Sequence, residues 1–350
     1  MTLRQTIANK KAEVQFREKL VKQHKGEQSY FPGQPDNLRI LIELKKRLSD
    51  TKKDILNLKK EGLLKSPYLE IGAEKCQRSM LCENQFKIKG IAADISFHSL
   101  DSANFFAKKL GFKKMPLRIC LDAYNLPFLD NCIPFIFFYQ TLHHFPDPSP
   151  ILRESARVLR SDGVVFINEE PIKQLFNLNL FRRDFNLNNL QKLLKRLLIL
   201  PFISTIGKSE MESGIIETSF WLDKWESILK DFERVKVTAT PLFGKGQLLE
   251  KNAHQGWLNP NLLTKALIAI LGGGIKVIAT KNKKPRLDFL SNDIFDILAC
   301  PDCKVRVSLK KSGSNLFYCQ KCGSEFPIKK DILIFLPRRQ RPLLKKIYVS

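Results

Sequence analysis

From residue 67 onwards the chain alternates short apolar runs with stretches of helical periodicity, and this alternation limits the fold more than any other feature. It begins with YLEI at Tyr68 and continues through IKGIAAD, LRICLD, PFIFFYQ and GVVFINEE, with helical stretches such as SPILRESARVLR between the runs. Strand–helix–strand repeats of this kind predict a parallel sheet with helices on both faces, in which the strands are almost continuously apolar. We therefore expect a doubly wound α/β domain.

The segments on either side of this alternation differ from it in character. The N-terminal part is charged and has helical periodicity, so we expect N-terminal helices that form a cap or a lid over a binding site. A segment rich in Phe, Asn and Leu, at about residues 172–215, interrupts the alternation and predicts a helical insertion. The expected division is an N-terminal helical region at 1–65, an α/β domain at 66–283, a linker at 284–292, a cysteine-rich unit at 293–337 and a basic tail at 338–350.

The net charge of +24 is concentrated at the two ends of the chain. Residues 1–65 carry 16 Lys and Arg against 8 Asp and Glu, and residues 281–350 carry 16 against 6. Such ends suit a polyanion, such as RNA or an acidic membrane surface, while solvated Lys-rich helix faces are the simpler interpretation. The N-terminal segment has no apolar leader, and the apolar stretch from Leu262 is broken by lysines and glycines. We expect a cytoplasmic protein with no transmembrane segment, and the sequence does not predict its oligomeric state.

Acidic residues and a glycine close the first three predicted strands. Glu70 and Gly72 end the first, Asp94 ends the second and Asp122 ends the third. Ligands of open parallel sheets bind at these carboxyl ends. An acid after the second strand can accept hydrogen bonds from ribose hydroxyls, and one after the third can accept from an adenine amino group. Glu74 in the first loop is unfavourable for a diphosphate, so a phosphate-free nucleoside cofactor with a sulfonium and an ammonium group fits better.

Five motifs, in this order and spacing, carry a family resemblance: YLEIG, AADIS, LDAYNLPFLDN, YQTLHHFPDP and ILRESARVLRSDGVVFINEEP. Together they resemble the class I S-adenosylmethionine-dependent methyltransferases, particularly the group that includes quinone-biosynthesis methyltransferases. The resemblance covers residues 65–171 and, more loosely, 216–283. It implies a Rossmann-like fold with a mostly parallel seven-stranded sheet, and S-adenosylmethionine as cofactor. Position by position, it implies that the cofactor-binding residues are Glu70, Gly72, Asp94, Ile95, Asp122, Ala123, Gln140 and Thr141.

The chain departs from the pattern of this family at two places. Family members commonly have further glycines after the first, where this chain has Ala73, Glu74, Lys75 and Cys76. The family also tends to begin the fourth strand with an acid, where this chain has Pro134. These departures favour weak cofactor binding or, as an alternative function, a non-catalytic scaffold.

His143 and His144 are the candidate catalytic residues. By the resemblance, this segment faces the methionine part of the cofactor and the entrance for the acceptor. A histidine there can take a proton from an acceptor hydroxyl or amine, because its pKa lies near neutrality. The alternatives are that one histidine packs under the loop while the other lines the pocket, or that Glu169 or Glu170 is the base.

The acceptor is expected to be a small molecule, a lipid-linked molecule or a saccharide. The quinone-type resemblance, Trp221, Trp225 and an apolar insertion support this expectation; the apolar residues of the insertion are Leu178, Phe181, Leu193, Leu194, Leu197 and Leu198. An RNA or protein methyltransferase is the alternative, supported by the basic ends. However, no Asn-Pro-Pro-aromatic run, the usual amine-positioning loop of such enzymes, follows the fourth strand. Peripheral contact with a membrane also stays open.

Four of the eight cysteines form two closely spaced pairs. Cys300 and Cys303 precede Cys319 and Cys322 by fifteen intervening residues, in the pattern C-x2-C…C-x2-C. This spacing predicts a tetrahedral four-thiolate Zn²⁺ site, which is closed to substrate and therefore structural. We expect the scattered cysteines to be core thiols: Cys76, Cys82, Cys120 and Cys132.

The cysteine-rich unit carries a second resemblance. LACPDCK…YCQKCGSEFPIKKDILIFLP, within residues 293–337, resembles the small zinc-binding activator protein of tRNA, rRNA and release-factor methyltransferases. The resemblance implies a zinc ribbon that stabilises or covers the methyltransferase domain in cis. The chain departs from the family at residues 332–334, which read Ile-Leu-Ile where a Gly-Ile-Pro-like turn is usual, so the final strand is expected to lie differently.

Overall fold

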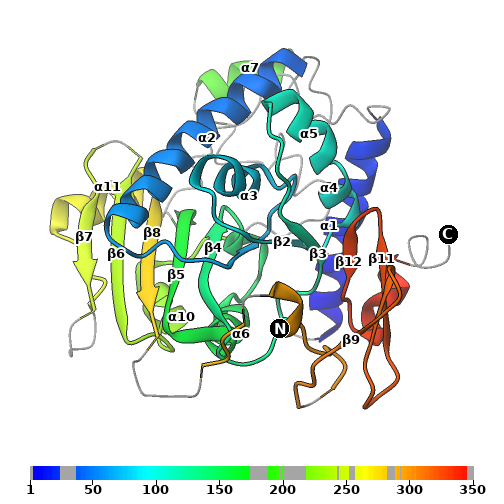
Figure 1. Ribbon diagram of the computed structural model, residues 1–350. Helices are drawn as coiled ribbons and strands as arrows, with labels where there is room; N and C mark the ends of the chain where they lie inside the picture. The colour runs from blue at the N-terminus through cyan, green and yellow to red at the C-terminus, as the bar shows by residue number, and fades with distance from the viewer. Residues whose placement is uncertain are drawn as a thin grey trace.

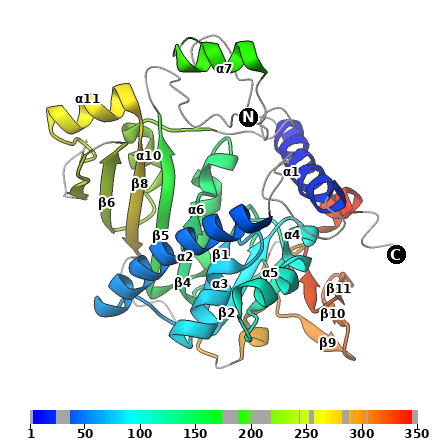
Figure 2. The ribbon, with the colours of Figure 1, turned by 90° about the horizontal axis from the view of Figure 1, so that it is seen from above.

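A computed structural model describes the protein at residues 3–23, 37–173, 188–197, 199, 218–242, 244–251, 257–281, 288–291, 293–303 and 305–344. These residues form one continuous β-sheet with helices on both faces (Figures 1 and 2). In this part of the chain no helix has both the length and the apolar character needed to cross a bilayer.

The sheet contains twelve described strands in the order β7-β6-β8-β5-β4-β1-β2-β3-β12-β11-β10-β9. Seven correspond to the strands that the sequence predicts: β1 (Tyr68–Ile71), β2 (Gly90–Asp94), β3 (Leu117–Cys120), β4 (Ile133–Tyr139), β5 (Leu159–Ile172), β6 (Arg234–Pro241) and β8 (Gly273–Thr280). The other five are β7 (Gln247–Glu250), β9 (Lys310–Ser312), β10 (Leu316–Tyr318), β11 (Glu325–Lys329) and β12 (Ile332–Ile334). β1 to β5 run parallel, and β8 lies between β5 and β6, antiparallel to both.

The predicted Rossmann-like α/β fold is therefore confirmed, but the predicted count of seven strands is not. The seven expected strands are all present and adjacent, and the sheet continues at both of its edges. β7 pairs with β6 as a hairpin partner, which the sequence did not signal because its burial alternates and half of its residues face solvent. The cysteine-rich unit supplies the remaining four strands.

The central strand β4 shows why the sheet forms here. All seven of its residues, IPFIFFY, are buried, as expected for a strand covered on both faces. Successive side chains point to opposite faces, so Phe135 and Phe137 pack with Tyr68 on one side while Ile136 and Phe138 pack on the other. Burying each Phe side chain contributes about 1.5–3 kcal/mol of transfer free energy.

The helices are divided between the two faces. The first face is covered by α2 (Asn37–Lys60), α3 (Gln77–Leu81), the π-helical turn η1 (Cys82–Phe86), α4 (Phe97–Asp101) and α5 (Ala103–Leu110). The second face is covered by α6 (Ser149–Val158) and α10 (Leu222–Ile228). Ile55 and Leu58 anchor α2, while Ile151 and Leu152 anchor α6. The remaining described helical segments are α1 (Leu3–Gln23), η2 (Leu142–His144), α7 (Asn189–Arg196), α11 (Leu262–Leu271), η4 (Ile294–Ile297) and η5 (Arg338–Leu344).

The cysteine-rich unit extends the sheet of the α/β domain instead of standing apart from it. β12 pairs in parallel with β3, with Ile332 opposite Arg118 and Ile334 opposite Cys120. Arg118 also donates a hydrogen bond to the carbonyl of Lys330, 3.0 Å away. Residues 332–334, where the sequence departs from the activator family, are therefore a buried strand at the junction of the two units (Figure 1).

Some sequence-based predictions fall outside the described residues. Leu178, Phe181 and Leu198 of the predicted insertion belong to this group, as do residues 284–287 of the predicted linker and residues 345–350 of the predicted tail. Within the described residues, the four scattered cysteines are buried thiols, as expected.

Candidate functional site

The loop after β1 keeps a glycine-like backbone at three positions, although only the first is a glycine. Gly72, Glu74 and Cys76 have φ of 77°, 46° and 58°, all in the left-handed region. A Cβ added to Gly72 would lie 2.4 Å from Cγ2 of Thr141, so no other residue fits this close approach. An L-residue in this conformation costs about 1–2 kcal/mol. The chain has therefore replaced two expected glycines while retaining the turn that they would adopt.

Glu70, which precedes this loop, is buried beneath it. Its Oε2 accepts hydrogen bonds from the backbone N–H and the hydroxyl of Ser79, at 3.0 and 2.5 Å. Burial raises the pKa of Glu70 to about 7, although Arg78 and these hydrogen bonds oppose the shift. The carboxyl group thus holds the start of α3 against the end of β1.

Asp94 connects the first loop to the second. Its Oδ2 accepts from the backbone N–H of Glu74 at 2.9 Å, and its Oδ1 accepts from that of Ser96 at 2.8 Å. The side chain is partly exposed, yet burial raises its pKa to about 6. Each oxygen has received one donor and keeps a second lone pair, so the carboxylate can accept two further hydrogen bonds. Ile95, beside it, is partly buried.

Asp122, just after β3, has three polar partners. Its Oδ1 accepts from the backbone N–H of Tyr124 at 3.1 Å. Its Oδ2 lies 2.6 Å from Nζ of Lys10 and also accepts from Nε2 of Gln340. Burial lowers the pKa of Lys10, and the ion pair with Asp122 opposes this shift. Ala123 follows as a buried residue, so the third strand end is closed by both ends of the chain.

The segment after β4 is organised by Glu170, which is fully buried. Glu170 accepts hydrogen bonds from the backbone N–H groups of Thr141, Leu142 and His143 at 2.7, 2.9 and 3.1 Å. Its Oε2 also lies 2.9 Å from Nδ1 of His143. Burial would raise the pKa of Glu170, but the hydrogen bonds from His143 and from the backbone lower it overall. Gln140 begins this segment with a left-handed φ of 49°.

The two adjacent histidines lie in different environments. The ring of His143 lies 4.2 Å from that of His144 and is partly exposed. Burial and the neighbouring His143 lower the pKa of His144 to about 4, and its Nδ1 is buried without a hydrogen-bond partner in the described part of the chain. A histidine with so low a pKa is a weak base, so His144 is poorly suited to proton transfer near neutral pH.

Helix α1 lies along the same ends of the strands. Arg17 reaches Oε1 of Glu74 at 3.2 Å, and Asn9 donates to the carbonyl of His144 at 3.0 Å. Burial would raise the pKa of Glu74, but Arg17 and neighbouring cations lower it to about 2. Together with the Lys10–Asp122 pair, these contacts place the N-terminal helix over three of the loops.

The residues that the sequence associates with the acceptor lie partly in the core and partly at the surface. Trp225 is 0% exposed and belongs to the core, so it does not support the expected acceptor class. It lies in α10, where it packs edge-on against Phe220 at 6.0 Å between ring centroids. Trp221 is 37% exposed, and Leu193 and Leu197 of α7 also face solvent.

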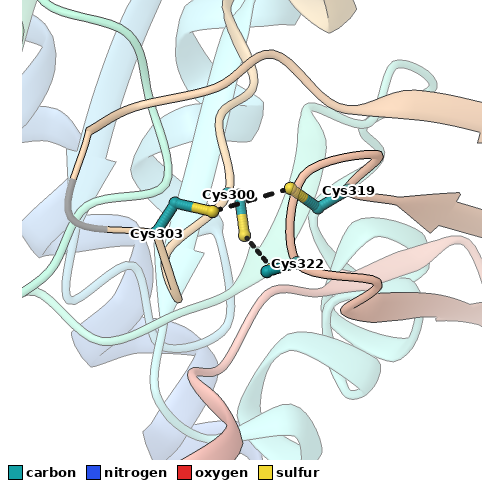
Figure 3. Close-up of side chains that lie close together, drawn as sticks. All are labelled: Cys300, Cys303, Cys319 and Cys322. Carbon is teal, nitrogen blue, oxygen red and sulfur yellow. Dashed lines mark hydrogen bonds between the residues drawn. The ribbon is translucent and has the colours of Figure 1, made fainter.

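The four paired cysteines converge on one point, as Figure 3 shows. Their sulfur atoms all lie within 4.8 Å of one another. Sγ of Cys300 lies 3.6 Å from that of Cys322, and Sγ of Cys303 lies 3.7 Å from that of Cys319. A tetrahedral Zn²⁺ with bonds of about 2.3 Å would separate its sulfur ligands by about 3.8 Å, whereas a disulfide needs about 2.05 Å. The geometry therefore matches a four-thiolate metal centre.

The sequence did not indicate two residues of this region, and it indicated a different role for a third. Lys10 and Gln340 were assigned only to a charged helix and a basic tail, and no local pattern links either of them to Asp122. Glu170 was considered as a base, yet it lies buried behind His143. Its position just after an apolar strand was the one available signal.

Comparison with known proteins agrees with the α/β part of the molecule. Residues 69–167 match the family model described as a methyltransferase domain, which confirms that prediction for this segment. The chain is 30% identical over 140 residues to 27-O-demethylrifamycin SV methyltransferase of Amycolatopsis mediterranei (strain S699). That match covers 39% of this chain and 49% of the relative, so the chain spans about half the length of the relative.

Solved structures of methyltransferases also resemble the chain. A SAM-dependent methyltransferase from Thermotoga maritima is 16% identical and covers 77% of this chain and 99% of its own, with a TM-score of 0.41. A SAM-dependent methyltransferase from Methanosarcina mazei is 18% identical. This match covers 63% of the present chain and 96% of the other protein, also with a TM-score of 0.41. A chain in a complex of the Trm112 methyltransferase activator with a methyltransferase from Haloferax volcanii is 12% identical. This match covers 69% of the present chain and 95% of the other, with a TM-score of 0.38.

Proposed function

We propose that this chain is an S-adenosylmethionine-dependent methyltransferase acting on a small-molecule, lipid-linked or saccharide acceptor. The observation that carries the proposal is the match of residues 69–167 to a methyltransferase domain, because this segment contains the strand ends that bear Gly72, Asp94 and Asp122. The carboxyl ends of neighbouring parallel strands meet at one edge of the sheet, where ligands of this fold class bind.

The residues at this edge fit the cofactor. Asp94 is partly exposed and can accept from two ribose hydroxyls, with Ile95 beside the adenine ring. Asp122 can accept from the adenine amino group through Oδ1, which has received one donor, and Ala123 lies next to it. Gly72 allows the backbone to approach the ligand closely. The family resemblance assigns Gln140 and Thr141 to the methionine part, together with Glu70 beneath the loop.

His143 is the proposed general base, and Glu170 orients it. The lowered pKa of Glu170 keeps this group ionised near neutral pH, so the carboxylate requires a donor at Nδ1 of His143. The imidazole then carries its proton on Nδ1 and its lone pair on Nε2, where it can take a proton from an acceptor hydroxyl or amine. The bound cofactor supplies an electrophilic methyl group on its sulfonium. Alignment of the acceptor with this methyl group provides much of the remaining rate enhancement.

The acceptor class is inferred from the exposed apolar side chains and the charged ends of the molecule. Exposed apolar side chains, including Trp221, Leu193 and Leu197, favour an apolar or amphipathic acceptor and leave room for contact with a membrane surface. RNA or protein as acceptor is the second candidate, because the basic ends lie beside the site. However, several of these cations are already paired with acids, among them Lys10, Arg17 and Arg341.

The cysteine-rich unit is proposed to be a structural zinc ribbon acting in cis. Its four thiols match a closed tetrahedral centre, and β12 continues the sheet beyond β3. A bound Zn²⁺ would stabilise this small unit by roughly 10–16 kcal/mol of apparent binding free energy, as in small zinc fingers. It would thereby hold β12 against the methyltransferase domain.

Calorimetric titration with S-adenosylmethionine tests the proposed function. We expect binding at micromolar to millimolar ligand, and loss of binding in Asp94→Ala with the fold retained. No binding to the full chain at millimolar cofactor would support the scaffold alternative. Retention of RNA that falls steeply with salt concentration would favour the RNA methyltransferase instead.

A further inference from the structure

Two residues from opposite ends of the chain meet at Asp122. Lys10 comes from α1, and Gln340 comes from η5, the turn that follows the last strand of the cysteine-rich unit. The relative exposures of Lys10, Asp122 and Gln340 are 8%, 1% and 4%, so this is a buried junction and not a surface contact.

The contact with Asp122 fixes the orientation of the Gln340 amide. A carboxylate only accepts hydrogen bonds, so the NH₂ end of the amide must face Asp122. The opposite end, Oε1, is buried and has no hydrogen-bond partner among the residues that the structure describes. A buried acceptor without a donor is unfavourable and calls for a ligand or a water molecule to satisfy it.

We propose that Gln340 is a cofactor-binding residue whose Oε1 accepts a hydrogen bond from the exocyclic amino group of adenine. This inference rests on the proposed function, in which Asp122 accepts from the same amino group. That group has two hydrogens, and the site offers two acceptors: Oδ1 of Asp122, which has received one donor, and Oε1 of Gln340. Recognition of both hydrogens would distinguish adenine from bases with an oxygen at this position.

The cysteine-rich unit determines where Gln340 lies. The backbone N–H of Arg338 donates to Asp302 at 2.8 Å, and its guanidinium donates to the carbonyl of Cys322 at 2.9 Å. Arg341 lies 3.6 Å from Asp302 on the other side of Gln340. Residues on both sides of Gln340 are therefore tied to residues next to the metal-binding cysteines. It follows that the ribbon contributes directly to the cofactor site of the domain to which it is fused.

The test compares two ligands that differ at the purine edge: adenine carries an amino group at C6, whereas hypoxanthine carries an oxygen there and a hydrogen on N1. The dissociation constants of S-adenosylhomocysteine and S-inosylhomocysteine are measured by calorimetry for the wild-type chain and for Gln340→Met. The methionine side chain retains the volume of glutamine and removes the amide. Asn315→Ala is the matched control, because Asn315 is an exposed amide residue of the same unit.

We expect the wild-type chain to prefer the adenine ligand, and Gln340→Met to lower this preference about fivefold, which corresponds to one hydrogen bond. Asn315→Ala should keep the wild-type preference. If Gln340→Met weakens both ligands equally, Gln340 only supports the fold and the inference is wrong. If it tightens the adenine ligand, Gln340 obstructs the site. No binding of S-adenosylhomocysteine to the wild-type chain would instead refute the proposed function itself.

Discussion

Oε2 of Glu170 lies 2.9 Å from Nδ1 of His143, and the same carboxylate accepts hydrogen bonds from three successive backbone N–H groups of the loop that carries this histidine. One buried acid therefore fixes both the loop and the orientation of the ring. The loop and the ring of His143 are held together by a carboxyl group that does not itself face solvent.

We expect His143→Ala and Glu170→Gln each to lower the turnover number by roughly 10²-fold, while the dissociation constant of the cofactor stays nearly unchanged. If the two residues act as a unit, the double variant will be no slower than His143→Ala alone. Turnover and calorimetric binding are measured on the same preparations, with thermal unfolding as a check of the fold.

Glu233→Gln makes the same chemical change at an exposed position and should leave turnover unaltered. Additive losses in the double variant would contradict the paired roles. A large loss in Glu169→Gln, with none in Glu170→Gln, would transfer the role of base to Glu169.

Gly72→Ala should destabilise the protein more than Gly111→Ala. Both glycines have positive φ, 77° and 72°, so both substitutions carry about 1–2 kcal/mol of backbone strain. Only at Gly72 does the added Cβ meet another side chain, that of Thr141 at 2.4 Å, which adds about 1–3 kcal/mol. Urea unfolding measures both. Thr141→Ala should recover part of the loss at Gly72, and equal costs at the two glycines would show that the contact relaxes freely.

The stability of the protein should depend on pH through Glu70. Its pKa of about 7 in the folded state lies above the ordinary value of 4.5, so between these pH values the folded state holds a proton that the unfolded state has released. The free energy of unfolding therefore falls as the pH rises across this interval, by up to about 3 kcal/mol. Asp94, with a pKa raised to about 6, acts in the same direction.

Glu70→Gln isolates the contribution of Glu70, because glutamine keeps an acceptor for Ser79 and cannot ionise. Denaturant unfolding at pH 5 and pH 7.5 should show a smaller difference in the variant than in the wild-type chain. An unchanged difference would mean that Glu70 titrates normally in the folded protein.

Removal of the metal should open the cysteine-rich unit before the rest of the molecule. We expect the purified chain to contain one Zn²⁺, and a chelator to increase amide hydrogen exchange in β10 to β12 while β1 and β4 remain protected. Cys319→Ser should lose the metal, whereas Cys132→Ser, at a buried thiol of the α/β domain, should keep it. Stable metal-free protein with a protected β12 would contradict the structural role.

The sequence predicted the strands whose burial can be read from their own residues. β4 is apolar throughout because it is covered on both faces, and the strand ends at Asp94 and Asp122 follow from that pattern. The cluster of four cysteines could be predicted equally well, because their spacing in the sequence indicates it locally. The short strand β7 was missed because half-exposed strands carry little apolar signal.

What the sequence could not predict depends on contacts between distant residues. Nothing near Lys10 or Gln340 indicates that both reach Asp122, because each contact depends on how a terminal segment folds back over the sheet. The sequence also could not place Trp225 in the core, because aromatic side chains occur in both cores and binding sites. Only the position of α10 against the sheet decides between these two uses.

The parallel pairing of β12 with β3 also has a consequence for biosynthesis. Residues 117–120 leave the ribosome early, but their partner strand at 332–334 lies almost at the end of the described chain. Until residues 332–334 have been translated, β3 is an open strand edge with unpaired backbone groups, which can pair with other chains. If the proposed zinc holds β12 in place, newly made chains should be prone to aggregate when zinc is scarce, because the covering strand then lacks its metal.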